Sequence, residues 1–105
     1  MFGWQIARVD GDSMTPSLGD GDYVLARKNA VAVPGDIALI RHHSLGLIVK
    51  RVKARDEDGC CVVAGDNPAS TSSDVLGAIE PDAIAGVVRW HVSPGGLLRL
   101  RRGAV

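Results

Sequence analysis

The sequence predicts a mainly β fold, built as a small bent antiparallel sheet or a partly open barrel with one or two short helical turns. Short apolar runs, rich in valine, leucine, isoleucine and alanine, alternate with glycine, aspartate and proline, and this pattern favours strands over helices. The runs recur at short intervals, which is typical of a small barrel or a strongly bent sheet. With 105 residues, of which 46% are hydrophobic, the chain is expected to form one domain with one modest core.

The first part of the chain contains two expected strands, residues 4–9 (WQIARV) and 22–28 (DYVLARK). The segment between them is rich in aspartate and glycine and ends in LGDG, a typical turn sequence. Within it, TPSL at residues 15–18 is expected to form one helical turn, with Thr15 as its cap and Pro16 at the first helical position.

Four further strands are expected between the breaks VPG, DEDG, GDNPASTSSD and SPGG, at residues 36–43, 45–55, 60–65 and 83–93. EPDAI, at the start of the last of these, is expected to form a second helical turn. We expect the core of a single domain to span residues 4–93 and the basic segment 94–105 to be a solvated C-terminal tail.

The charge and cysteine content exclude several classes of partner and site. The 12 basic and 12 acidic side chains balance, so no general attraction to nucleic acid or to an anionic membrane surface is expected. Cys60 and Cys61 are adjacent, which suits neither a disulfide framework nor a zinc site, and no apolar run approaches the ~20 residues of a membrane helix. We therefore expect a cytoplasmic protein without a metal, associated with a membrane only if an N-terminal anchor has been removed.

The run LGLIVKRVKAR contains a lysine within an apolar row. Because side chains alternate along a strand, Ile48, Lys50 and Val52 share one face, and the other face carries Leu47, Val49, Arg51 and Lys53. Loss of hydration on the apolar face disfavours the charged ammonium of Lys50 and leaves an amine that can accept a proton. Lys53 is expected to reach water, and Arg51 either to reach water or to form a salt bridge. The alternative is that Lys50 extends to the edge of the sheet and stays hydrated.

A serine that such a base could activate lies in VDGDSMTPSLGDGD, residues 9–22. A serine hydroxyl is a poor nucleophile unless a base lies beside it, and a serine in a loop of this kind usually bonds to its own backbone. Ser13 and Lys50 therefore become informative only in combination with the residues around them.

Four blocks of the sequence resemble the serine–lysine peptidases that include type I signal peptidases and LexA-type repressors. The blocks are GDSMTPSLGDGDYVLARK (11–28), PGDIALIR (34–41), LIVKRV (47–52) and GDNPASTSSD (65–74). They occur in the order found in that family, and the resemblance covers about residues 9–90. The resemblance implies a fold of the signal peptidase and LexA catalytic-domain type.

The resemblance implies that Ser13 is the nucleophile and Lys50 the general base, a dyad that needs no histidine, metal or cofactor. The backbone N–H of Ser13 is the expected donor to the tetrahedral oxyanion. Many relatives add a serine hydroxyl two positions before the nucleophile, where this chain has Gly11, so the second donor stays open. A hydroxyl of the Gly-Asp-Asn block is expected to orient the lysine, and the candidates, with a slight preference for the last, are Ser70, Thr71 and Ser72.

The resemblance also implies that a substrate peptide binds in extended form by pairing with a sheet edge. Residues 9–13 and the strand around IALI (37–40) are the expected edges. Asp12, Met14 and Ile40 are the expected substrate contacts, although Met14 is equally well explained as a core methionine. Two residues of the Gly-Asp-Asn block, Asp66 and Asn67, are expected to shape the loop around the site.

The expected function is a processing cut by a serine endopeptidase, acting on a protein precursor with an N-terminal extension. The Gly-Asp-Asn block fits the signal peptidase branch, and within it a short chain without a membrane helix resembles the maturation proteases of nickel-containing superoxide dismutase. Two alternatives stay open. One is the soluble catalytic domain of a type I signal peptidase, and the other is a non-catalytic peptide-binding or dimerisation module with the same fold.

Overall fold

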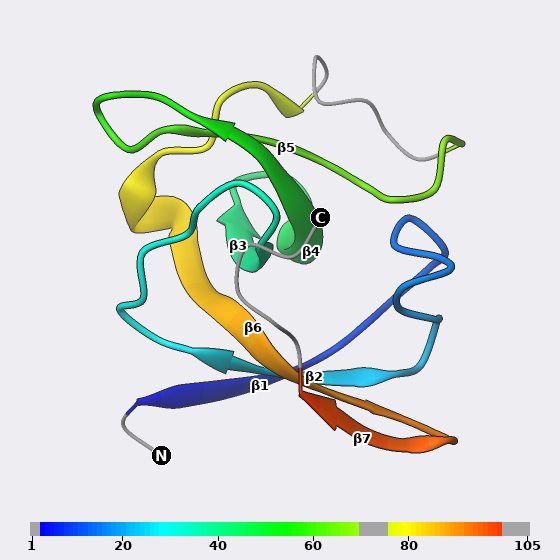
Figure 1. The fold of residues 1–105 in the computed structure, drawn as a ribbon. Coiled ribbons are helices and arrows are strands. Elements are labelled where there is room, and N and C mark those ends of the chain that lie inside the picture. Colours follow the sequence, from blue (N-terminus) through cyan, green and yellow to red (C-terminus); the bar gives the residue numbers. More distant parts are fainter. Residues whose placement is uncertain (1–2, 70–75, 100–105) are drawn as a thin grey trace.

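The computed structural model of the chain describes residues 3–69 and 76–99, and within these ranges its regular secondary structure consists almost wholly of antiparallel strands (Figure 1). The elements are β1 (Trp4–Arg8), β2 (Tyr23–Arg27), β3 (Ile37–His42), β4 (Gly46–Arg55), β5 (Cys61–Ala64), the 3₁₀ turn η1 (Pro81–Ala83), β6 (Ile84–Ser93) and β7 (Gly96–Arg99). The predicted fold class is confirmed, as are all six predicted strands and the helical turn predicted in EPDAI.

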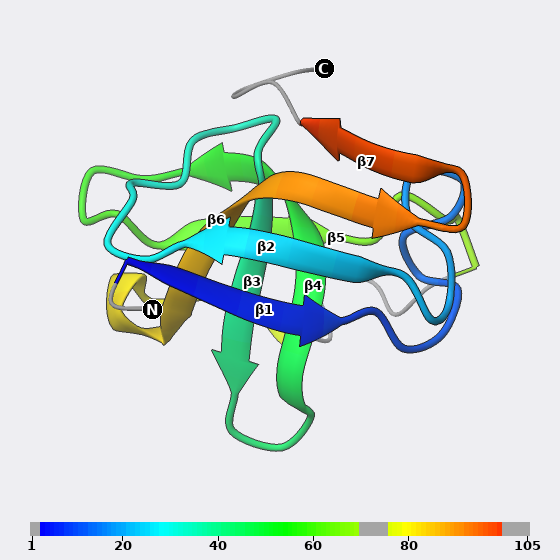
Figure 2. The same ribbon diagram turned by 90° about the horizontal axis from the view of Figure 1, so that it is seen from below.

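The strands form one strongly coiled sheet in the order β1-β2-β6-β3-β4-β5, with β7 paired to β6 off this path. Figure 2 shows that β3 and β4 cross steeply behind β1, β2, β6 and β7. β6 joins the two parts because its first residues pair with β3 while its last residues pair with β7. The pairings of β6 with β2 and with β3 shift register at Leu25/Ala26 and at Leu39/Ile40, and such irregularities bend the sheet.

The core consists of two apolar clusters on the two sides of the coiled sheet. The first contains Met14 and Leu18 of the β1–β2 loop together with Val49 of β4. The second contains Ile40 of β3 and Val52 of β4, with Ile48 packed against it. β4 is therefore covered on both faces in its central part, as the placement of Ile48 and Val52 on one face predicts.

The helical turn predicted for residues 15–18 does not form. Thr15 N–H donates to the Asp12 carbonyl at 3.1 Å and Leu18 N–H donates to the Met14 carbonyl at 2.9 Å, so two separate turns replace a run of helical bonds. The Thr15–Pro16 peptide is cis. The Thr15 hydroxyl does not cap a helix but donates to the Asp12 carbonyl.

The prediction of a solvated tail from residue 94 is wrong for residues 96–99. These residues form β7, which pairs with the end of β6 in a hairpin where Ser93 lies opposite Gly96. SPGG is therefore a hairpin turn within the sheet and not its end. Gly96 has a φ of +124°, a backbone conformation that residues with a side chain rarely adopt.

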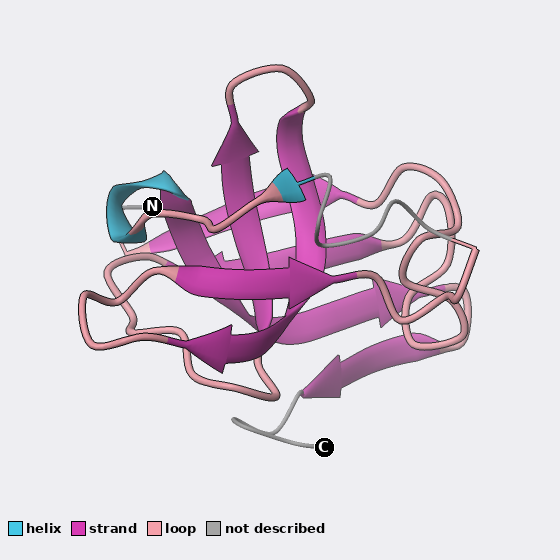
Figure 3. Cartoon of the chain, turned by 90° about the horizontal axis from the view of Figure 1, so that it is seen from above, coloured by secondary structure: helices cyan, strands magenta, loops and turns pink. Residues whose placement is uncertain are grey.

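The loops that carry the predicted functional residues gather at one end of the sheet. Figure 3 shows the β1–β2 loop and the segment after β5 side by side there, while the β3–β4 hairpin projects beyond the other strands. Hydrogen bonds join the two loops, as described below. The described residues contain no helix long and apolar enough to cross a bilayer.

Candidate active site

Ser13 lies in the loop between β1 and β2, and that loop is closed by hydrogen bonds at its base. Val9 N–H donates to the Asp22 carbonyl at 2.7 Å, and Gly21 N–H donates to the Val9 carbonyl at 2.8 Å. Directly after Ser13, the Met14 side chain is fully buried in the first core cluster. The loop is therefore anchored on both sides of the serine, which is itself partly exposed.

Lys50 lies in the middle of β4, opposite Ala38 of β3, and is only 6% exposed. Its amine makes no hydrogen bond or ion pair with the part of the chain that the structure describes. Because burial removes water and no anion compensates, the pKa of Lys50 is lowered from its ordinary value of 10.5. The predicted burial of this lysine is confirmed, and a lowered pKa favours the neutral amine that a general base requires.

Ser13 and Lys50 line the same cavity, whose volume is 330 Å³. One wall is the continuous segment 8–13, from the end of β1 into the loop. The other wall is formed by the β3–β4 hairpin, from Leu45 and residues 47–50. The cavity thus also brings Gly11 and Asp12 to the site.

Residues 65–67, which follow β5, tie the Ser13 loop to β4. Asp66 accepts two hydrogen bonds from the Arg51 guanidinium, at 2.7 and 3.1 Å, and a third from the Ser17 hydroxyl at 2.6 Å. Burial raises the pKa of Asp66, but the bonds from Arg51 and Ser17 outweigh this, so the pKa lies below its ordinary value. The carboxylate therefore stays charged and joins Arg51, the neighbour of the buried lysine, to the loop that carries Ser13.

The family of the chain follows from comparison with models of known protein families. Residues 4–89 match the peptidase S24-like family, a span that includes both walls of the cavity and the segment that ties them. The chain belongs to the peptidase S24-like family. No protein in a search of curated proteins matches it. Membership supports a serine peptidase of the LexA and signal peptidase type, in agreement with the sequence resemblance and the mainly β fold.

Two of the expected substrate contacts in this S24-like chain do not lie at the cavity. Ile40 is fully buried in the second core cluster, and its strand β3 lies between β6 and β4. An interior strand has no free edge for a substrate, so the expectations for Ile40 and for the IALI strand are corrected. Met14 is fully buried as well, which supports the alternative that it is a core residue.

The donors expected for the oxyanion differ in their hydrogen bonds. Gly11 has a φ of +82° and open space where a Cβ would lie, but its N–H already donates to the Asp20 carboxylate at 2.8 Å. Ser13 N–H makes no hydrogen bond with the described residues. The hydroxyls expected to orient the lysine lie outside the described residues, namely Ser70, Thr71 and Ser72.

Arg51 does not reach water as expected from its position on the strand. Its guanidinium side chain is 19% exposed, pairs with Asp66, and also donates to the Gly35 carbonyl at 2.8 Å. The salt bridge, one of the two alternatives expected for Arg51, is confirmed, although the sequence did not predict the loop that covers this face. No local signal could have found the pairing, because Asp66 lies 15 positions away.

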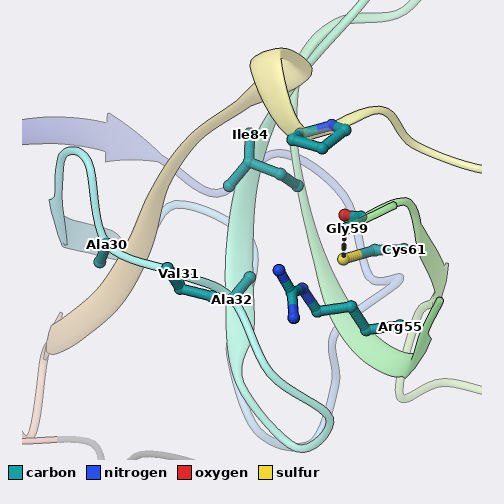
Figure 4. A pocket seen from close by; sticks show the side chains of 8 residues that line it. Ala30, Val31, Ala32, Arg55, Gly59, Cys61 and Ile84 are labelled. Carbon is teal, nitrogen blue, oxygen red and sulfur yellow. Dashed lines mark hydrogen bonds between the residues drawn. The ribbon is translucent and has the colours of Figure 1, made fainter. Parts of the chain in front are cut away.

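The S24-like chain has a second cavity, of 130 Å³, at the opposite end of β4, where Arg55 extends toward Ala32 (Figure 4). Cys61 lies in its wall and donates a weak hydrogen bond to the Gly59 carbonyl. Burial raises the pKa of the Cys61 thiol, and burial followed by nearby acidic groups raises that of Cys60. Raised pKa values leave little thiolate, so neither cysteine is suited to act as a nucleophile.

Among residues 3–69 and 76–99, neither the buried His91–Asp22 pair nor any group of metal-ligating side chains forms a site comparable to the Ser13 and Lys50 cavity. His91 pairs with Asp22 at 2.7 Å in the interior, away from the cavity that holds Ser13. Within the same ranges, no group of three or more histidine, cysteine, aspartate or glutamate side chains is placed to hold a metal ion. The arrangement best suited to catalysis is therefore the hydroxyl and the amine at the first cavity.

Proposed function

We propose that this S24-like chain is a serine endopeptidase in which Ser13 is the nucleophile and Lys50 the general base. The observation that carries the proposal is Lys50, which is buried, has no counter-ion among the residues that the structure describes, has a lowered pKa and lines the same cavity as Ser13. An uncompensated buried amine costs folding free energy, and a role as base accounts for its presence there.

The chemistry follows from these two groups. Neutral Lys50 takes the proton of the Ser13 hydroxyl as the oxygen attacks a peptide carbonyl, and the resulting ammonium gives that proton to the leaving amine. Lys50, neutral again, then activates a water that hydrolyses the acyl-enzyme. The negative charge on the substrate oxygen is held by the Ser13 N–H, which has no other partner in the described structure.

The substrate is an extended peptide lying between the two walls of the cavity. β1 is an edge strand, and residues 9–12 connect its end to Ser13 along the cavity wall, so a peptide paired with this edge can extend toward the hydroxyl. Leu45 and Leu47 of the hairpin are exposed at 54% and 44% on the opposite wall. They favour apolar side chains in the bound peptide.

The favoured biological substrate is the precursor of a nickel-containing superoxide dismutase, from which one cut removes the N-terminal extension. The Gly-Asp-Asn block supports the signal peptidase branch, and the narrower assignment within that branch follows the sequence resemblance described above. The same site would serve the catalytic domain of a type I signal peptidase, whose substrates are secretory precursors.

The test is cleavage of that precursor and of a peptide library by the wild-type chain and by Ser13→Ala, Lys50→Met and Lys53→Met. Ser13→Ala is expected to abolish cleavage, and Lys50→Met to lower kcat about 10²–10⁴-fold. Lys53 is exposed on the same strand, so Lys53→Met should stay within about twofold of wild type. Full activity of either dyad variant would exclude the mechanism.

A non-catalytic binding module remains a second candidate because of a surface away from Ser13. Ile6, Tyr23, Val92 and Leu97 expose apolar side chains side by side on β1, β2, β6 and β7. This candidate predicts no cleavage of any library member by the wild-type chain, together with peptide binding that Ser13→Ala leaves unchanged.

A further inference from the structure

We propose that Asn67, together with Thr15, orients the peptide group that presents the Ser13 N–H to the oxyanion. The inference rests on the proposed function, since it assigns a positioning role within the Ser13 site. Neither residue lines the cavity. Both therefore act through the backbone beside Ser13 and not by touching the substrate.

The carbonyl of Asp12 is held by three hydrogen bonds. Asn67 Nδ2 donates to it at 3.0 Å, the Thr15 hydroxyl at 2.9 Å and the Thr15 N–H at 3.1 Å. The Asn67 backbone N–H also donates to the carbonyl of Ser13 at 2.9 Å. The carbonyl groups on both sides of the Ser13 Cα are thus fixed by residues 15 and 67.

The side-chain amide of Asn67 is itself held in one orientation. Its Oδ1 accepts the Ala69 N–H at 2.9 Å, while its Nδ2 faces two oxygens, the Asp12 carbonyl and the Thr15 hydroxyl, each at 3.0 Å. A reversed amide would bring its oxygen against those acceptors and leave its NH₂ against a donor. The donor end of Asn67 therefore faces the loop.

The Asp12 carbonyl and the Ser13 N–H belong to the same peptide group, which is trans. In a planar trans peptide the C=O and N–H point in opposite directions, so fixing the carbonyl toward Asn67 and Thr15 turns the N–H away from them. Both residues of this peptide line the cavity. Hydrogen bonds accepted by the carbonyl also polarise the group and strengthen its N–H as a donor.

The neighbouring amide shows why this orientation matters. Gly11 N–H is engaged by Asp20, so it does not supply the oxyanion donor that a serine at that position gives in the relatives the sequence resembles. The Ser13 N–H then supplies a larger share of the stabilisation of the oxyanion, so the direction in which this N–H points matters more. Asn67 lies 55 positions from Asp12 in the sequence, yet together with Thr15 it sets this direction.

The experiment uses Asn67→Asp and Thr15→Val, which keep the side-chain shape but remove the donors, and Thr15→Ser, which keeps the hydroxyl. Asn29→Asp, at an exposed position outside the site, is the matched control. The substrate is the library peptide that the wild-type chain cleaves fastest, and the inhibitor is the aldehyde of the same sequence, which forms a tetrahedral adduct with the serine.

Asn67→Asp and Thr15→Val are expected to lower kcat about 10–100-fold with KM within about twofold, since an oxyanion donor acts mainly in the transition state. Inhibition by the aldehyde should weaken by the same factor. Thr15→Val adds no charge near Lys50 and should leave the midpoint of the pH–rate profile unchanged. Thr15→Ser and Asn29→Asp should retain wild-type kcat.

Wild-type kcat in Asn67→Asp, or a loss confined to KM, would overturn the inference. The carbonyl ¹³C chemical shift of Asp12 gives a readout independent of catalysis, and it should move in Asn67→Asp but not in Asn29→Asp. An unmoved shift also overturns the inference. If the wild-type chain cleaves no peptide, the proposed function fails, while this shift still decides whether Asn67 holds the Asp12–Ser13 peptide.

Discussion

At the scale of single residues, the molecule is organised around a buried amine that folding alone would not select. Lys50 is surrounded by the apolar side chains of β4 and has no anionic partner among the described residues. Its charged form is therefore unfavourable in the folded chain. Retaining it at neutral pH costs stability, and the proposed role as a general base would account for that cost.

Replacing Lys50 by methionine is expected to stabilise the fold while removing activity. Methionine has a similar length and no charge, so unfolding free energy at pH 7 should rise by on the order of 1 kcal/mol, or roughly 4–8 °C in Tm. The sign depends on pH in a defined way. As pH rises toward 10.5, the folded chain loses the Lys50 proton before the unfolded chain does, so wild-type stability increases and the advantage of methionine shrinks.

Thermal unfolding of wild type, Lys50→Met and Lys53→Met between pH 6 and pH 10 provides the measurement. Lys53→Met, on the exposed part of β4, should lie within about 0.5 kcal/mol of wild type. A methionine variant less stable than wild type across this range would show that Lys50 has a stabilising partner.

The position of Lys50 was predictable because alternation along a strand is a local signal, and Ile48 and Val52 flank the lysine on its face. The burial of Ile40 and Met14 was not predictable in the same way. Whether an apolar residue faces a core or a substrate depends on which strands become interior, and this follows from pairings between distant parts of the chain.

At the scale of elements, the segment after β5 acts as a connection between β4 and the Ser13 loop. Arg51 and Asp66 form a bidentate salt bridge whose side chains are 19% and 14% exposed. Ser17 extends the connection to the loop. Because the lysine and the serine lie on different elements, this connection fixes their relative position.

Asp66→Asn is expected to destabilise the fold by about 1–3 kcal/mol, because it leaves the Arg51 charge largely buried without its partner. A double-mutant cycle with Arg51→Met should give a coupling of about 1 kcal/mol or more. The free energies of unfolding of the single and double variants are measured with urea. If the losses in stability are additive, the interaction between Arg51 and Asp66 does not stabilise the fold.

Gly86 determines how closely β6 approaches β2. A Cβ at this position would lie 2.9 Å from the Arg27 carbonyl oxygen and 3.0 Å from the Ala26 Cβ, distances that require the backbone to move. Gly86→Ala should therefore cost about 1–3 kcal/mol. Gly95→Ala is the control, since the nearest atom to its Cβ, Ser93 Oγ, is 3.7 Å away, and it should unfold at the wild-type urea concentration.

Strand boundaries followed closely from the apolar runs, and the errors came from the breaks between them. Pro94 and Gly95 were interpreted as the end of the fold, but the same residues also suit a hairpin turn. The choice between these two outcomes depends on whether the next residues find a partner strand. β7 does so on β6, at a place that the local sequence does not specify.

At the scale of the whole molecule, the coiled sheet brings the ends of distant strands together. His91 of β6 and Asp22, at the start of β2, form a buried pair at 2.7 Å between adjacent strands. The Gly19 N–H and then His91 hold the pKa of Asp22 below its ordinary value. The pair thereby links the base of the Ser13 loop to the sheet that carries the core.

Acid should weaken this link. Since the folded-state pKa of Asp22 is lowered, its contribution to stability is complete above the ordinary value of 3.8 and is lost as pH falls through the folded-state value. Asp22→Asn should reduce stability by about 1–3 kcal/mol at pH 7 and flatten its dependence on pH below 5. Acid unfolding is followed by circular dichroism. If Asp22→Asn unfolds over the same pH range as wild type, Asp22 does not contribute to stability in this way.

The central claim concerns the protonation of one amine in the intact molecule, and an NMR titration of the ¹³Cε resonance of Lys50 tests it most directly. The Lys50 signal is assigned by its loss in Lys50→Met and its retention in Lys53→Met. The value of kcat/KM for the best peptide substrate is measured over the same pH range. We predict that Lys50 titrates below 10.5 and that kcat/KM rises with the same midpoint. A Lys50 resonance that titrates at or above 10.5, as for a hydrated lysine, would contradict the account.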